Sequence, residues 1–117
     1  MKKSKSLYTF LRPILRNSSL RWPERNEAIK LARVSRGLYL CNICKEEFPR
    51  TKIHVDHIEP IISIKENFTT WDDFIKKLFC NVEQFQVLCE QCHMNKTSIE
   101  NNMRNHYKKL AKKKKVK

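Results

Sequence analysis

Four of the five cysteines fall into two Cys-x-x-Cys pairs, Cys41/Cys44 and Cys89/Cys92, separated by the segment 45–88. Two such pairs are typical of a zinc ion held by four thiolates. A zinc ion with four protein ligands is closed, so it stabilises the fold and does not activate water. The spacing therefore predicts a structural zinc, and any hydrolytic chemistry would need a second ion.

A second set of groups that could do chemistry lies beside these pairs. Asp56 and His57 are neighbours in the apolar segment 53–58, and His93 directly follows the second cysteine pair. Carboxylates and imidazoles bind divalent cations, and a neutral imidazole accepts a proton near neutral pH. A zinc ion that joins the two cysteine pairs is expected to bring Asp56-His57 close to His93.

Three sequence blocks together resemble the HNH endonucleases, in particular small phage-type members with a ββα-metal motif and a four-cysteine zinc. The resemblance covers roughly residues 20–100. It implies a strand, a long loop, a second strand and a helix around a divalent ion. The blocks are Cys41-x-x-Cys44, Val55-Asp56-His57-Ile58-x-Pro60 and Leu88-Cys89-x-x-Cys92-His93-x-x-Lys96-Thr97.

The resemblance also assigns roles. His57 takes the place of the general base, and Asp56 and His93 take the places of the ligands of a catalytic Mg²⁺, Mn²⁺, Ni²⁺ or Zn²⁺. The family's middle asparagine is absent from its usual position, where Gln84 stands, and Asn81 is the alternative. The implied activity is divalent-metal-dependent hydrolysis of DNA, leaving 5′-phosphate and 3′-hydroxyl ends. The implied setting is the cytoplasm, that of a bacterial host if the protein is phage-encoded. The resemblance leaves open a phage packaging partner, another protein partner, and a role in restriction or homing.

The charge distribution indicates a polyanionic partner. The net charge is +13, with ten Lys/Arg against two Glu in residues 1–40 and eight Lys/Arg without an acid in residues 103–117. Double-stranded DNA with weak sequence preference is the expected partner, whereas no long apolar stretch suggests a membrane. The alternative is a non-catalytic zinc module that binds nucleic acid. The predicted phosphate-binding residues are Arg12, Arg16, Arg21, Arg25, Arg33, Lys96, Lys108 and Lys109.

One α+β domain over residues 1–117 is expected to position these groups, with a basic arm or helix (1–40), a zinc and ββα-metal core (41–100) and a basic helix and tail (101–117). Within the basic arm, residues 7–15 could form a helix or an extended arm, and 17–19 a loop. The pattern predicts a helix over 23–36 with Ala28, Ile29, Ala32 and Val34 facing inward, ended by Gly37.

The core is expected to contain a strand and two helices. The strand, 53–58, would place His54 and Asp56 on one face. A helix over 71–80, capped by Thr70, has a core-facing stripe and includes Cys80, which is expected to be a small buried hydrophobic residue. The last helix begins near residue 92 or 93 and runs toward residue 110. Its predicted apolar seam is Ile99, Met103, Tyr107 and Leu110.

Overall fold

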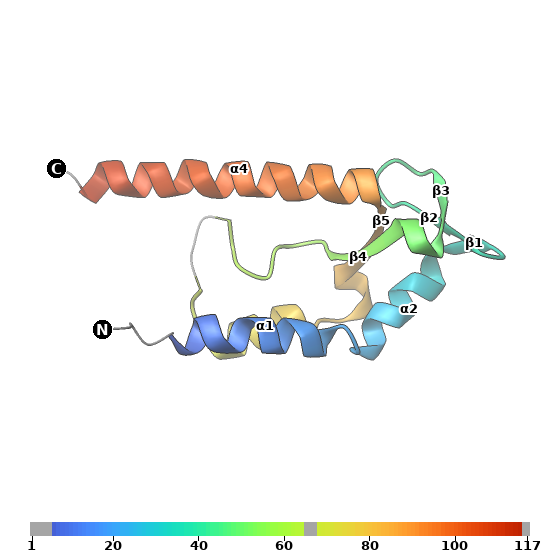
Figure 1. Cartoon of the computed structure of the whole chain (residues 1–117), viewed down its shortest axis with the longest axis horizontal. Helices are drawn as coiled ribbons and strands as arrows, with labels where there is room; N and C mark the ends of the chain where they lie inside the picture. Colours follow the sequence, from blue (N-terminus) through green and yellow to red (C-terminus); the bar gives the residue numbers. More distant parts are fainter. Residues whose placement is uncertain (1–5, 65–67, 116–117) are drawn as a thin grey trace.

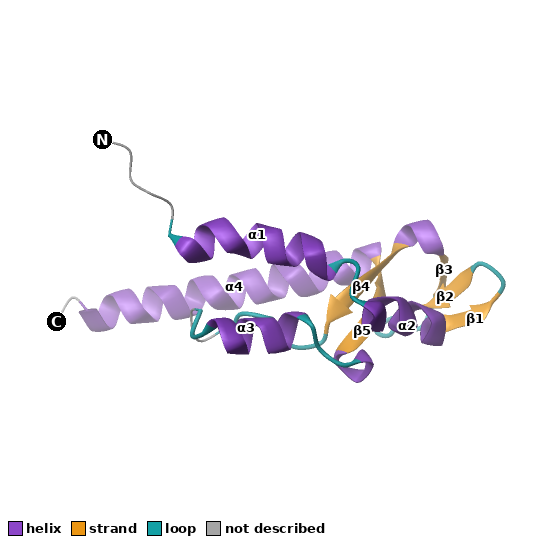
Figure 2. Ribbon diagram, turned by 90° about the horizontal axis from the view of Figure 1, so that it is seen from below, coloured by secondary structure: helices purple, strands orange, loops and turns teal. Residues whose placement is uncertain are grey.

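The computed structural model describes residues 6–64 and 68–115, which form four α-helices and two small antiparallel sheets (Figures 1 and 2). The helices are α1 (Leu7–Ser19), α2 (Pro23–Ala32), α3 (Trp71–Leu78) and α4 (Glu90–Lys115). The first sheet contains β1 (Arg33–Ser35), β2 (Leu38–Leu40) and β3 (Glu47–Pro49), and the second contains β4 (Ile53–His57) and β5 (Phe85–Cys89). The predicted α+β class and the helices at both flanks are confirmed.

Helix α1 is longer than expected. Ser6 caps it by accepting the Thr9 N–H, and the helix continues through Pro13 to Ser19. The loop predicted over 17–19 is therefore wrong. The Ser19 hydroxyl is buried and donates to the Arg16 carbonyl at 2.7 Å, so the helix itself satisfies this polar side chain.

Helix α2 ends at Ala32, four residues before the predicted end, because Arg33–Ser35 pair with β2. Gly37 adopts φ +75° in the turn between β1 and β2. This is the left-handed conformation that glycine tolerates best, but it serves a hairpin turn instead of the predicted helix end. Ala28 and Ile29 are buried as expected, whereas Val34 is 48% exposed.

The apolar core consists of small clusters between the helices and the sheets. In one, Ile29 of α2 packs on Ile53 and Val87 of the second sheet. In another, Phe74 and Leu78 of α3 pack on Ile61. The Thr70 cap of α3 is confirmed, since its hydroxyl accepts the Asp73 N–H at 3.1 Å.

Cys80 follows α3 and is half-buried, outside the group formed by the other four cysteines. Its backbone carbonyl accepts the Trp22 Nε1–H at 2.7 Å, which ties the end of α3 to the start of α2.

The second sheet leads directly into the longest helix. β4 and β5 pair antiparallel with Asp56 opposite Gln86 and His57 opposite Phe85, and α4 begins at Glu90 with no intervening loop. Three of the four residues of the predicted apolar seam of α4 are exposed, namely Ile99 (59%), Met103 (43%) and Leu110 (41%), whereas Tyr107 is half-buried. Of the helices in the described ranges, none is both long and apolar enough to cross a membrane.

Candidate functional site

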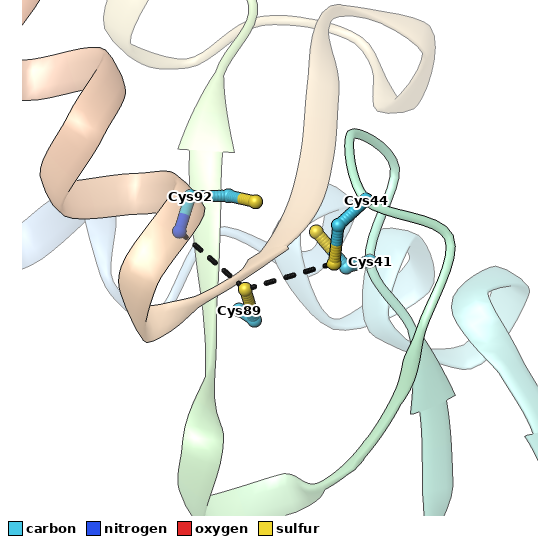
Figure 3. Close-up of side chains that lie close together, drawn as sticks. All are labelled: Cys41, Cys44, Cys89 and Cys92. Atoms are coloured by element: carbon cyan, nitrogen blue, oxygen red, sulfur yellow. Dashed lines mark hydrogen bonds between the residues drawn. The ribbon is translucent and has the colours of Figure 1, made fainter.

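The four paired cysteines converge at the junction of the two sheets and α4. Cys41 and Cys44 lie in the turn after β2, Cys89 ends β5, and Cys92 lies in the first turn of α4 (Figure 3). Their sulfur atoms all lie within 4.8 Å of one another, and the Cys44 and Cys89 Sγ atoms are 3.9 Å apart. Zn–S bonds of about 2.3 Å in a tetrahedron place the sulfurs about 3.8 Å apart. The cluster is therefore compatible with a structural metal such as zinc.

The local backbone holds the first pair in place. Cys41 is fully buried; its N–H donates to the Glu46 carbonyl at 2.9 Å, and its own carbonyl accepts the Lys45 N–H at 3.0 Å. Lys45 adopts φ +62°, which lets this short turn close on itself. On the other side, the Cys92 N–H donates to the Cys89 sulfur at 3.4 Å.

The electrostatics of the four thiols also suit a cation. Burial would raise the pKa of Cys41, but backbone N–H groups of Cys89, Cys44 and Ile43 outweigh it and lower the pKa to about 6. Burial and the neighbouring thiols raise the pKa of Cys92 to about 12. One thiolate thus makes further ionisation unfavourable, and a divalent cation would remove that penalty.

Asp56 and His93 lie close together on the α4 side of β4. The Asp56 Oδ1 and His93 Nε2 atoms are 4.0 Å apart, and their side chains are 13% and 35% exposed. The His54 ring stacks on the His93 ring with 4.8 Å between centroids, and this contact supports the His93 imidazole on one face. A tetrahedral ion with bonds of about 2.0–2.2 Å places its ligand atoms about 3.3–3.6 Å apart, so an approach of about 0.5 Å would let both atoms bind one ion. The residue pair that the sequence predicted as metal ligands is therefore brought together.

His57 points to the opposite face of β4 from Asp56, as regular strand alternation requires. Its ring lies 4.8 Å from the Phe85 ring, and its Nε2 is 3.0 Å from the Leu78 carbonyl. Because β4 ends at His57, both side chains still line the same two cavities, of about 290 and 560 Å³.

The chemistry of His57 follows from these contacts. A carbonyl oxygen only accepts, so Nε2 carries the hydrogen and Nδ1 carries the free lone pair. Burial lowers the pKa of His57 below its usual 6.5, and the charge of Arg25 lowers it further, against the opposing hydrogen bond to Leu78 and the charge of Asp56. The imidazole is therefore neutral at physiological pH and can accept a proton.

Two residues that sequence reasoning missed hold Asp56 in position. Gln86, its cross-strand partner, donates from Nε2 to Asp56 Oδ2 at 2.9 Å and accepts the Asn42 amide at 2.8 Å. Since Asn42 lies between Cys41 and Cys44, these two bonds connect the cysteine cluster to the Asp56 carboxylate. The antiparallel pairing of the two strands would have indicated Gln86, had the register been known.

Lys96, predicted as a DNA contact, lies instead between two carboxylates and a backbone carbonyl. Its ammonium lies 3.1 Å from Asp56 Oδ2 and 3.1 Å from Glu100 Oε1, and it donates to the His57 carbonyl at 3.2 Å. The side chain is only 19% exposed. Lys96 therefore neutralises Asp56 and braces the end of β4, while Oδ1 of Asp56 is left to face His93.

Gln84, predicted for the middle position, lies in the short 3-10 turn Val82–Gln84 before β5. Its carbonyl accepts the Ile58 N–H at 2.9 Å, and its side chain lines a 190 Å³ cavity with His57. Asn81 precedes the turn and accepts the Gln84 N–H through its carbonyl. Both therefore contribute backbone bonds that hold the loop next to His57.

Three of the predicted phosphate-binding arginines, Arg12, Arg16 and Arg25, line the cavities that contain His57. Arg16 and the half-buried Arg25 both line the 560 Å³ cavity that contains Asp56 and His57. Among the described residues, neither guanidinium pairs with a carboxylate. Burial lowers the pKa of each, and neighbouring arginines lower it further: Arg12 for Arg16, and Arg16 for Arg25. Such a wall favours an anionic ligand.

Of the other predicted basic residues, Lys108 lines a further cavity toward the N-terminus of α1, which Arg12 also lines. The remaining three are exposed on the surface, namely Arg21, Arg33 and Lys109.

Comparisons with known proteins identify no relative. No family model matches the chain, and neither a curated protein nor a solved structure is significantly similar to it. The function must therefore be inferred from the site itself.

Proposed function

We propose that this protein is a divalent-metal-dependent DNA endonuclease of the HNH type. The observation that carries the proposal is the common cavity of His57, Asp56 and His93, walled by Arg16. A proton acceptor, a pair of metal-binding groups and an unpaired cation are the components that phosphodiester hydrolysis requires. The chain order β4, β5, α4, with Asp56-His57 at the end of the first strand and His93 in the helix, supports the resemblance.

In this proposal His57 is the general base. Its Nδ1 takes a proton from water, while the bond from Nε2 to the Leu78 carbonyl holds the ring and stabilises the imidazolium that forms. The hydroxide attacks phosphorus, the bond to the 3′-oxygen breaks, and that oxygen takes up a proton. The products are 5′-phosphate and 3′-hydroxyl ends.

Asp56 and His93 would hold the catalytic cation, which supplies positive charge beside the phosphate when bound. Gln86 and Lys96 fix the other carboxylate oxygen, so that Oδ1 is directed at His93. Arg16 and Arg25 bind the non-bridging phosphate oxygens and disfavour a protonated His57.

The four-cysteine cluster is proposed to hold zinc, and its role is structural. It fixes the turn after β2 against the start of α4, and thereby the position of His93 relative to Asp56. If all four thiolates bound it, a zinc ion would have no coordination position left for water.

A second candidate is a non-catalytic zinc module that binds nucleic acid. The observation that favours it is the Lys96 ammonium, which already neutralises Asp56 and reduces the need for a cation there. The two candidates differ in whether the wild-type protein cleaves DNA, and therefore in whether His57→Ala has any cleavage to lose.

The test is relaxation of supercoiled plasmid by purified protein with Mg²⁺, Mn²⁺ or Ni²⁺, using His57→Ala and the exposed-helix control His106→Ala. We expect the wild type and His106→Ala to cleave, and His57→Ala to lose cleavage by at least about 100-fold while retaining zinc and DNA affinity. Absence of cleavage by the wild type with every ion would favour the binding module.

A further inference from the structure

A groove extends from the candidate active site along the molecule. α1 and α4 run in opposite directions on either side of the segment that follows β4 (Figure 1). Residues of both helices line two adjoining cavities, of about 290 and 360 Å³, which share Arg12, Ile62 and Arg104. Arg104 donates to the Ile62 carbonyl at 2.8 Å and so attaches the floor of the groove to α4.

The walls of the groove are set by helical spacing. On α1, Tyr8, Arg12 and Arg16 follow each other at intervals of four residues and so share one face. On α4, Lys96, Glu100, Arg104 and Lys108 do the same. Glu100 is paired with Lys96, so the unpaired charge along the groove is positive.

The character of the groove changes with distance from His57. The near cavity contains Asp56, His57 and His93. The far cavity contains three aromatic rings with cations beside them. Tyr8 and Phe68 already pack edge to face at 4.8 Å. The aromatic residues of the far cavity are Tyr8, Phe68 and Tyr107.

A positively charged groove that ends at aromatic rings is the arrangement that binds single-stranded nucleic acid, because phosphates follow the cations and bases stack on the rings. A duplex surface would be expected to offer cations alone, since paired bases are not available for stacking on side chains. The cavity sizes agree, since pockets of about 300–1,000 Å³ enclose groups of nucleotide size.

Accordingly, we propose that the groove between α1 and α4 binds a single-stranded DNA segment, with one base against Tyr8, Phe68 and Tyr107. This inference rests on the proposed nuclease function, which makes the cavity with Asp56, His57 and His93 the site of cleavage. It narrows the class of DNA that the proposed nuclease would prefer. The preferred substrate becomes a duplex with a single-stranded extension instead of a continuous duplex. The uniformly double-stranded partner expected from composition would then be the weaker ligand.

The geometry also gives the length of the extension. Lys96 contacts the His57 carbonyl, and Tyr107 lies eleven residues further along α4, or about 16 Å at 1.5 Å per residue. A stacked strand rises about 3.4 Å per nucleotide, so the distance corresponds to at most about five nucleotides. Affinity should increase with extension length and then level off.

The experiment measures binding, not cleavage, so that it is independent of the proposed reaction. Fluorescently labelled duplexes with equal numbers of phosphates, blunt or with 5′ or 3′ extensions of one to ten nucleotides, are titrated with zinc-loaded protein without added Mg²⁺. One stacked base predicts about five- to 100-fold tighter binding of at least one type of extension, with a plateau by about five nucleotides.

Three variants locate the effect. Tyr107→Leu and Tyr8→Leu should remove most of the preference for an extension and leave blunt-duplex affinity within about two-fold, because leucine keeps the apolar volume but offers no ring. Phe10→Leu is the matched control, since Phe10 lies on α1 outside the groove and is 56% exposed. It should bind like the wild type, and thermal melts establish that each variant is folded.

Equal affinity for blunt and extended duplexes would overturn the proposal, as would a gain that rises steadily to ten nucleotides, because a groove of about 16 Å holds at most about five stacked nucleotides. A loss in Phe10→Leu as large as in Tyr107→Leu would also overturn it. If extended DNA binds as expected but is never cleaved with any divalent ion, the groove stands and the nuclease proposal fails.

Discussion

Substitution of Gln86 tests whether Asp56 must be held in place. In Gln86→Leu, Asp56 Oδ2 loses the 2.9 Å bond from the amide and keeps only Lys96. A hydrogen bond to a charged group contributes about 1.5–3 kcal/mol, and retention of Lys96 favours the lower end. We therefore expect a loss of about 1–2 kcal/mol and a melting temperature lower by about 5 °C.

The functional loss should be larger than the loss of stability suggests. Removal of a residue that orients a metal ligand typically lowers metal affinity or activity by about 10–100-fold. We expect a reduction of that size in plasmid cleavage and in Mn²⁺ binding measured by electron paramagnetic resonance, with DNA affinity unchanged. Asn42→Ala removes the link between Gln86 and the cysteine turn, together with an exposed bond from Lys45, and should reduce cleavage and Mn²⁺ binding by a smaller factor.

Gln91→Leu is the matched control, because Gln91 is exposed on α4 and its amide bonds only to Asn95, one turn away. It should change stability by less than about 0.5 kcal/mol and leave cleavage unchanged. If Gln86→Leu cleaves and binds Mn²⁺ within two-fold of the wild type, Asp56 does not need its cross-strand partner and the reasoning is refuted.

Cys92→Ser should not retain zinc and should melt far below the wild type, because a structural zinc contributes on the order of 10 kcal/mol to small domains. Elemental analysis should find zinc in Cys80→Ser; zinc lost from Cys80→Ser but kept in Cys92→Ser would place the metal elsewhere. The lowered pKa of His57 predicts that cleavage persists below pH 6.5, which a pH–rate profile measures; a loss of cleavage on acidification that already begins above pH 7 would contradict the assignment. Thermal melts should show that stability declines as pH falls through 6.5, because the unfolded chain then takes up a proton that the folded chain does not. In a denaturant titration, Ile99→Ser should change the free energy of unfolding by less than about 0.5 kcal/mol, because Ile99 is 59% exposed. Leu78→Ala should lower it by about 2–5 kcal/mol, and a loss of that size for Ile99→Ser would mean that the α4 seam is covered.

Local sequence signals predicted those features that depend on nearby residues. Thr70 and the apolar spacing of residues 71–79 are sufficient to define α3, and the approach of Asp56 to His93 follows once the two cysteine pairs meet. The stripe itself was only partly buried, since Phe74 and Leu78 are 1% exposed but Ile75 is 42%.

Other features depend on long-range pairing, which no local pattern contains. Residues 33–35 continue a helical sequence but pair with β2, because a strand partner outweighs weak helix propensity. The Gln86–Asp56 bond depends on the register of β4 and β5, and the role of Lys96 depends on its approach to the end of β4. Lys96 lies in a strongly basic chain and is readily interpreted as a phosphate contact, although its nearest partners are two carboxylates.

Because no loop separates β5 from α4, a small rotation of α4 at the cysteine cluster moves the far end of the helix by a larger distance. Over 26 residues the helix extends about 39 Å, so a tilt of about 5° at Glu90 displaces its far end by about 3 Å, close to the thickness of one base. A small displacement within the cysteine cluster would therefore change the gap between Tyr8 and Tyr107 by about 2 Å, since Tyr107 lies about 26 Å along the helix from Glu90.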